Sequence, residues 1–201
     1  MSIHFSKMTG KLKGIPAINT NTVTNEFCIK MNKSDAICKS CYSMNMLNGS
    51  RKNCQPAFER NSVLLSQVIL EDSEIPIINA AFFRFHGHGE LINIKHMINF
   101  HNIALKNPHC NFALWTKRRD IIRNYKKDYK VPDNFILIYS NPTVNVVRLT
   151  PPEGFDKVFN VVEKDQHQDI QNCTGQNCID CLTCYKNNGE SVITEAIKKR
   201  S

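Results

Sequence analysis

Phe135-Ile136-Leu137-Ile138-Tyr139-Ser140 is the stretch of this chain that best indicates its fold. It is a continuous apolar run, bounded by Asn134 on one side and by Asn141-Pro142 on the other. A short apolar run between turn-forming residues is typical of a buried strand. The stretch therefore predicts a strand in the middle of a sheet, and the neighbouring segments indicate which kind of sheet it is.

Helix-like and strand-like patterns alternate on both sides of this strand. Before it, apolar residues at three-to-four spacing predict helices over 57–69, 91–105 and 118–129, with strands over 80–85 and 111–115. After it come β-rich pieces at 144–149 and 158–162, and then a short helix at 191–199. Strands that alternate with helices of about 10–15 residues imply βαβ units and a parallel sheet.

The length of 201 residues limits the architecture. A full eight-fold barrel needs about 250 residues. We therefore expect an α/β fold, either a partial (β/α) barrel or an open, mostly parallel sheet with a cysteine-rich C-terminal loop. The prediction is a single domain over 1–201, with an N-terminal loop and short strands over 1–27, a βα body over 28–165 and a cysteine-rich segment over 166–201.

The composition excludes several classes of protein. A hydrophobic content of 41% excludes a disordered chain. No apolar run reaches the roughly 20 residues of a membrane helix, and the N-terminus has no apolar signal segment. We expect no membrane association and a cytoplasmic location, which is the host cytoplasm if the protein is phage-encoded.

Nine cysteines are the most informative feature of the composition. Structural disulfides are rare in a reducing cytosol, so such cysteines indicate metal binding or catalysis. Cys54 and Cys110 stand apart and are interpreted as thiols that act as small hydrophobic side chains. The other seven form two groups: Cys28, Cys38 and Cys41, and then Cys173, Cys178, Cys181 and Cys184.

The C-terminal group runs Cys173-(x4)-Cys178-(x2)-Cys181-(x2)-Cys184. Successive cysteines in one short run can each bind a different iron atom of a single [4Fe–4S] cluster. Zinc sites more often use two separated pairs. We predict an iron–sulfur cluster, with a zinc site and a metal-free loop as the alternatives.

The N-terminal group is Cys28-(x9)-Cys38-Lys39-Ser40-Cys41. Three thiolates would hold a [4Fe–4S] cluster and leave one iron open, as a catalytic zinc keeps one free position. The alternative is a redox or structural pair. We expect both cysteine groups at the face of the sheet or partial barrel where the strands end. Whether the chain holds one cluster or two is left open by the spacing.

Two polar segments follow predicted strands. In Arg84-Phe-His86-Gly-His88-Gly-Glu90, a charged Arg within an aromatic strand needs a partner, and His86 is expected on the same face of the strand. The glycines would allow a ligand to approach, and Glu90 would accept backbone N–H groups or a ligand amine. The alternative is a solvated strand end with an Arg84–Glu90 ion pair.

The second segment is Trp115-Thr116-Lys117-Arg118-Arg119. Lys117 is predicted to contact an anion or nucleotide, with Trp115 stacking on it. Basic residues at a helix N-terminus oppose the helix dipole, which favours a functional reason for them. The alternative is a buried Trp followed by a solvated helix start.

Together these motifs resemble a bacteriophage-encoded iron–sulfur family known as gene product eighty-eight. The matching motifs are Cys38-x-x-Cys41-Tyr42, Arg84-x-His86-x-x-Gly89-Glu90, Trp115-Thr116-Lys117 and the C-terminal cysteines, with Glu90 for Asp and Trp115 for Tyr. The resemblance covers roughly residues 25–195. It implies a bound cluster and a host-cell setting.

A more distant similarity is to radical S-adenosylmethionine enzymes, which have a partial barrel and a three-cysteine cluster. His88, Gly89 and Glu90 stand where that family binds the methionine amine, so this similarity implies S-adenosylmethionine as an alternative cofactor. The spacer between Cys28 and Cys38 is nine residues here, where that family has three.

Three hypotheses of function follow. In the first, the chain is an iron–sulfur enzyme of radical or sulfur-handling chemistry, with Arg84, His86, Glu90 and Lys117 at the substrate. In the second, a net charge of +8 supports a module that binds nucleic acid or a host protein, and its cluster or zinc is structural. In the third, which we rank last, it is an electron-transfer protein.

Overall fold

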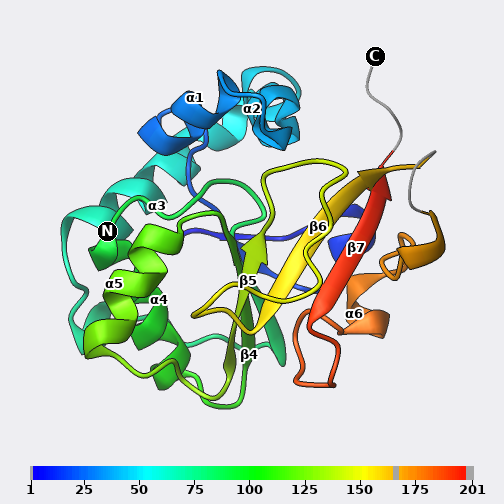
Figure 1. The fold of residues 1–201 in the computed structure, drawn as a ribbon. Coiled ribbons are helices and arrows are strands. Elements are labelled where there is room, and N and C mark those ends of the chain that lie inside the picture. Colours follow the sequence, from blue (N-terminus) through cyan, green and yellow to red (C-terminus); the bar gives the residue numbers. More distant parts are fainter. Residues whose placement is uncertain (1, 165–167, 198–201) are drawn as a thin grey trace.

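A seven-stranded sheet forms the centre of the computed structural model, which describes residues 2–164 and 168–197. The strands lie in chain order, β1 pairs antiparallel with β2, and every other pair is parallel (Figure 1). Their bounds are β1 Phe5–Ser6, β2 Ala17–Ile18, β3 Phe82–Phe85, β4 Asn111–Thr116, β5 Phe135–Ser140, β6 Lys157–Glu163 and β7 Val192–Ile197. The described strands form an open sheet with β1 and β7 at its edges, so the predicted mostly parallel α/β sheet is confirmed.

Six α-helices and five short 3₁₀ turns occur in the described residues. The helices are α1 Glu26–Asn32, α2 Tyr42–Asn48, α3 Gln55–Gln67, α4 Ile94–Lys106, α5 Arg119–Asp128 and α6 Cys178–Cys181. The 3₁₀ turns are η1 Gly10–Leu12, η2 Ile37–Ser40, η3 Lys52–Cys54, η4 Asp72–Glu74 and η5 Gln168–Ile170. None of the described helices has the length and apolar character to cross a membrane.

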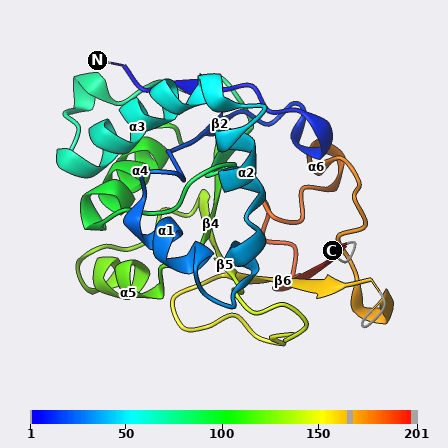
Figure 2. The same cartoon turned by 90° about the horizontal axis from the view of Figure 1, so that it is seen from above.

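One face of the sheet is covered by α3, α4 and α5 (Figure 2). Phe85 of β3 lies in the middle of this core, with its ring 3.9 Å from the Phe100 ring on α4 and 5.0 Å from the Phe112 ring on β4. Stacked aromatic rings bury large apolar areas, which is the main stabilising contribution to such a layer. The main core of the protein therefore lies between the sheet and these three helices.

The opposite face is covered by the cysteine-rich C-terminal segment and by the chain before β2. Ile15 and Tyr185 pack there on Ala113, Ile136 and Ile138, which point away from the helices. In Figure 2, α6 lies on the far side of the sheet from α4 and α5. The C-terminal cysteines are thus held against a face of the sheet.

A third group of elements covers the carboxyl ends of the strands. Figure 1 shows α1 and α2, with η2 between them, above the ends toward which β5 and β7 point. The Ile37 N–H donates to the Pro142 carbonyl at 2.8 Å, and the Tyr42 hydroxyl donates to the Gly87 carbonyl. These bonds fix the first cysteine segment over the edge where β3 and β5 end.

Two predicted elements differ from the structure. Residues 144–149 form no strand, because the side chains of Asn141 and Asn160 bond the backbone of Val146 and Arg148 in place of a neighbouring strand. The predicted helix at 191–199 is strand β7, which pairs in parallel with β6; residues 198–199 lie outside the described part. The β-branched residues Val192, Ile193 and Thr194 favour the strand.

Candidate functional site

The first cysteine group is built on α1, η2 and the start of α2. Asn25 caps α1 by accepting the Cys28 N–H at Oδ1 (3.2 Å), and its Nδ2 donates to the Glu90 carbonyl (3.0 Å). Asn32 at the end of α1 donates to the Cys38 carbonyl at 2.7 Å. Cys41 directly precedes α2. Side-chain amides therefore fix the backbone of this otherwise irregular segment.

Lys117 lies close to these thiols at the end of β4. Burial raises the pKa of Cys28 and of Cys38, and in both cases the positive charge of Lys117 opposes the rise. Cys28 also senses the charges of Cys38, Cys41 and Glu90. The ammonium of Lys117 donates to Ser140 Oγ at 2.9 Å. The structure thus brings together three predicted ligands and one predicted catalytic residue at the carboxyl edge of the sheet.

Glu90 is buried, with 5% of its surface exposed, and its carboxylate is held by the chain itself. Oε1 accepts from the Leu91 N–H (2.8 Å) and the Thr116 hydroxyl (2.5 Å), and Oε2 accepts from the Lys117 N–H (2.9 Å). Burial raises the pKa of Glu90, while the Lys117 charge and these hydrogen bonds oppose the rise. Glu90 therefore positions the end of β4, and the alternative of an Arg84–Glu90 ion pair is wrong. Binding of a ligand amine by Glu90 stays a prediction.

His86 lies on the other face of the sheet from the one expected. Its φ of 65° ends the alternation of β3, and its ring packs on His96 (5.1 Å between centroids) and Phe100 (5.2 Å) of α4. The prediction that Arg84 and His86 share a face is wrong for this reason. Both ring nitrogens of His86 are buried and have no hydrogen-bond partner among the described residues.

His88 and Gly89 are also engaged within the chain. Arg51 donates to His88 Nε2 at 3.3 Å, which assigns the proton to Nδ1 and makes it the donor to Ser43 Oγ at 2.8 Å. Gly89 has a φ of 98°, and a Cβ there would lie 2.0 Å from Thr20 Oγ1. Gly89 was expected to let a ligand come close to the backbone. In the structure it is Thr20, in the segment after β2, that comes close to Gly89. Cofactor binding by His88 and Gly89 stays a prediction.

Arg84 and Trp115 form a stacked pair on the face opposite the helices. The guanidinium carbon of Arg84 lies 3.8 Å from the Trp115 ring centroid, and its Nε donates to the His86 carbonyl at 3.1 Å. The prediction was that Trp115 stacks on a bound nucleotide. In the structure its ring stacks on the guanidinium of Arg84. Arg118 at the start of α5 bonds Asp120 and the Leu91 carbonyl, a structural reason for its basic character.

The second cysteine group encloses a cavity of about 140 Å³. All four of its cysteines line this cavity, together with Leu182, Tyr185 and Ile193 among others. Cys178 and Cys184 pack against the same apolar cluster as Tyr185, on the face of the sheet opposite the helices. The two cysteine groups were expected at one strand-end edge; the first lies there, but the second lies on the sheet face, because its segment packs beside β7.

Three cations act on these thiols: Arg84, Lys11 and, at Cys184, Lys157. Burial raises the pKa of Cys184 to about 12, and the charge of Arg84 opposes the rise. Burial likewise raises the pKa of Cys178, opposed by Arg84 and Lys11. Burial also acts on Cys181, but hydrogen bonds with Thr183 (3.2 Å) and Gln176 (3.4 Å) outweigh it and lower the pKa of this exposed thiol. The four thiols of this cavity therefore have cations as well as the carboxylates of Glu190 and Glu195 close to them.

These residues belong to a segment that matches a known protein family. A family model described as "Gene product 88" matches residues 6–183. The chain belongs to the gene product 88 family. No curated protein and no solved structure matched it. The membership of the gene product 88 family that the motifs indicated is confirmed, whereas the iron–sulfur character and the similarity to radical S-adenosylmethionine enzymes stay predictions. The matched range of this gene product 88 protein includes both cysteine groups except Cys184, and it also includes Arg84 and Lys117.

This gene product 88 protein has no ready-made site for a single ion in the part of the chain that the structure describes. No three His, Cys, Asp or Glu side chains come close enough together there to hold one metal ion. A structural zinc needs four ligands at about 2.0–2.3 Å from one centre. The thiols line a cavity, and they are not gathered around one point.

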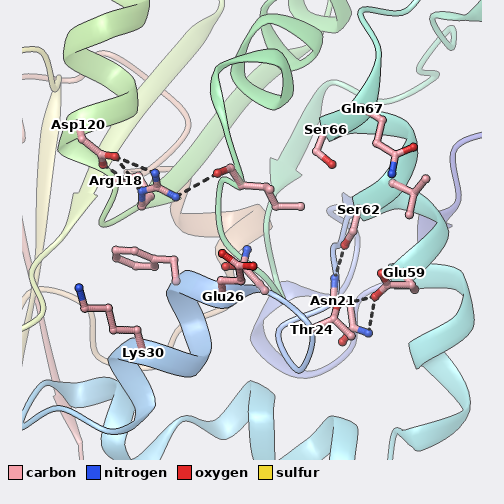
Figure 3. A pocket seen from close by; sticks show the side chains of 14 residues that line it. Asn21, Thr24, Glu26, Lys30, Glu59, Ser62, Ser66, Gln67, Arg118 and Asp120 are labelled. Carbon is pink, nitrogen blue, oxygen red and sulfur yellow. Dashed lines mark hydrogen bonds and ion pairs between the residues drawn. The ribbon is translucent and has the colours of Figure 1, made fainter.

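A larger cavity of about 610 Å³ lies between α1, α3 and the start of α5 (Figure 3). Glu59 accepts hydrogen bonds there from Asn21 Nδ2 (2.8 Å) and the Thr24 hydroxyl. The Phe27 ring and the Arg118 guanidinium face each other at 5.0 Å. These two residues directly neighbour Cys28 and Lys117 in the chain. No motif in the sequence indicates this cavity, because the polar run before Cys28 has the composition of a loop or of short strands.

Proposed function

We propose that this protein is an iron–sulfur protein whose C-terminal group, Cys173, Cys178, Cys181 and Cys184, holds a [4Fe–4S] cluster. One observation carries the proposal: all four thiols of this group line one cavity. Four thiolates bound to a cluster carry net negative charge, and the charge of Arg84, which acts on Cys178 and Cys184, offsets it. The cluster would supply the redox chemistry, and the residues named here would bind it and tune it.

The shape of the cavity favours a cluster over zinc. Its volume of about 140 Å³ is several times the roughly 30 Å³ that one water occupies in the liquid. One zinc ion would need all its ligands within about 2.3 Å of a single point. A cubane presents four separate iron corners, so its thiolates stand further apart and surround a larger volume.

The first group, Cys28, Cys38 and Cys41, is proposed as a second, open site at the strand-end edge. Three thiolates leave one iron free for a substrate or cofactor, for which S-adenosylmethionine is one candidate. Lys117 would bind an anionic group of that ligand, since among the described residues its ammonium donates a hydrogen bond to Ser140 alone. Glu90 would position Lys117 through its backbone. Radical generation and sulfur handling are the two candidate reactions.

Free thiols and a cluster both need a reducing compartment, so we place the protein in the cytoplasm of a phage-infected host. Binding of nucleic acid or of a host protein through its net charge of +8 stays the second candidate function.

The test is anaerobic purification with iron, zinc and acid-labile sulfide counts and an electron paramagnetic resonance spectrum. About eight irons per chain support two cubanes and about four support one, following the iron content of the [4Fe–4S] type. Cys178→Ala with Cys184→Ala is expected to remove about four irons. Cys54→Ala, a half-buried cysteine outside both groups, is expected to keep all of them. Zinc without iron refutes the proposal.

A further inference from the structure

Arg84 is a charged side chain that the sequence places inside an aromatic strand, and the structure gives it no counter-ion. It is half-buried, and none of the described carboxylates lies within ion-pair distance of it. Its contacts are the Trp115 ring at 3.8 Å and the His86 carbonyl at 3.1 Å. A cation taken partly out of water without an anion is costly, so an anionic neighbour is expected.

The C-terminal cavity lies next to this stacked pair, because Trp115 packs on Tyr185 with ring centroids 5.8 Å apart and Tyr185 lines the cavity. Burial is the largest influence on the pKa values of Cys178, Cys184 and Tyr185, and in all three the Arg84 charge opposes the rise. Two other cations act on these thiols: Lys11 forms an ion pair with Glu195, and the Lys157 ammonium, which interacts with Cys184, donates to Asn188 Oδ1 (3.0 Å) and to the Glu190 carbonyl (2.6 Å). Arg84 acts on both Cys178 and Cys184 and has no ion-pair partner among the described residues.

We propose that the C-terminal cysteine cavity is a redox centre and that Arg84 sets its reduction potential. This inference rests on the proposed function, since it requires the cluster. In the step itself, one electron from an external one-electron donor enters the cluster, whose core passes from the 2+ to the 1+ state. No bond is made or broken and no proton moves.

The sign of the effect follows from electrostatics. Reduction adds one negative charge to the cluster, so a nearby cation stabilises the reduced state more than the oxidised state. Arg84 therefore raises the potential. Its stacking on Trp115 and its bond to His86 fix the guanidinium in place, so that little reorganisation is needed when the charge changes.

The surroundings of the cavity suit electron transfer. Cys181 is exposed to solvent, so an external donor can come close to one of the thiolates. On the inner side Tyr185, adjacent to Cys184, packs on Trp115 with ring centroids 5.8 Å apart. A site with only a structural role has no need of a solvent-exposed ligand or of an unpaired arginine.

The experiment is a redox titration of the full-length protein, purified anaerobically, with dithionite as donor and electron paramagnetic resonance as readout. The signal is assigned to the C-terminal site by its absence from Cys178→Ala/Cys184→Ala. Arg84→Gln is expected to lower the midpoint potential of this signal. Arg84→Lys keeps a charge without the planar stacking, so it should lower the potential by less.

The matched control is Lys11→Gln combined with Glu195→Gln, which removes two opposite charges at the same cavity. Its potential is expected to stay close to that of the unmodified protein. An Arg84→Gln protein with full iron content and an unchanged potential overturns the inference, as does a loaded site that dithionite does not reduce.

The outcomes also separate this inference from the proposed function. If the unmodified protein holds no iron, both fail; if it holds iron and the variants do not shift the potential, only the inference fails. If Arg84→Gln loads no iron, Arg84→Met decides, because it also removes the charge but keeps a long side chain that can pack on Trp115; an unchanged potential in that variant overturns the inference.

Discussion

The Thr116 hydroxyl donates a hydrogen bond to Oε1 of Glu90 at 2.5 Å, and both side chains are buried. The bond joins the loop after β3 to the end of β4, directly before Lys117. Because Glu90 also accepts two backbone N–H groups, its loss leaves three donors unpaired.

We expect Glu90→Ala to lower the free energy of unfolding by about 2–4 kcal/mol, since each buried donor left without an acceptor costs about 1–3 kcal/mol and water can reach some of them. Urea denaturation measures this. Glu153→Ala, at an exposed position, is the control and should stay within about 0.5 kcal/mol. Equal stabilities of the two variants would contradict the role given to Glu90.

Gly89 lies in the loop after β3, and Gly175, in the C-terminal cysteine segment, serves as its control. Both have positive φ, 98° and 89°, but a Cβ at Gly89 would lie 2.7 Å from the Thr20 carbonyl oxygen, whereas a Cβ at Gly175 has open space. Gly175→Ala should cost about 1 kcal/mol from backbone strain alone. Gly89→Ala should cost at least about 2 kcal/mol more, because backbone atoms must also move apart. Thermal unfolding compares the two, and similar losses would exclude a steric role for Gly89.

Three buried histidines predict acid sensitivity. Burial lowers the pKa of His96 to about 3 and that of His88 to about 4, and it also lowers the pKa of His86. Below pH 6.5 the unfolded chain binds protons that the folded protein does not, so stability falls as the pH drops from 6.5 toward these values.

Each such histidine contributes up to about 1.4 kcal/mol per pH unit in that range. His86→Asn removes one of them and retains a residue type that tolerates positive φ. We expect its stability to fall less steeply between pH 6.5 and 5, by about 1.4 kcal/mol per unit. Denaturation curves at several pH values test this, and a slope equal to that of the unmodified protein would show that His86 stays uncoupled from folding.

Tyr42 connects the first cysteine group to the loop after β3 through its hydroxyl bond to the Gly87 carbonyl. Tyr42→Phe removes this bond at a cost of about 1 kcal/mol and should speed amide hydrogen exchange over α2. Tyr139→Phe is the control, because no hydrogen bond of the Tyr139 hydroxyl occurs in the described part of the chain. Unchanged exchange in α2 would mean that this segment is held by its other contacts.

The sequence alone was sufficient for the layered fold. Continuous apolar runs such as Phe135–Ser140 and the helical spacing of 118–129 are local patterns, and they predicted β4, β5, β6 and the helices α3 to α5 close to their observed positions. It also separated Cys110, which is buried, from the seven grouped cysteines. Local patterning could not distinguish strand from helix at β7, where pairing with β6 decides.

Only the tertiary structure decided where the chemistry-bearing residues lie. The sequence grouped the cysteines correctly by spacing, but it could not show that one group covers the strand ends and the other packs on a face of the sheet. The sequence predicted that His86 would lie on the same face of the strand as Arg84, whereas the positive φ of His86 turns its ring toward α4. The physical reason is that side-chain direction depends on the backbone angle at each residue, and that angle is set by contacts between segments far apart in the chain.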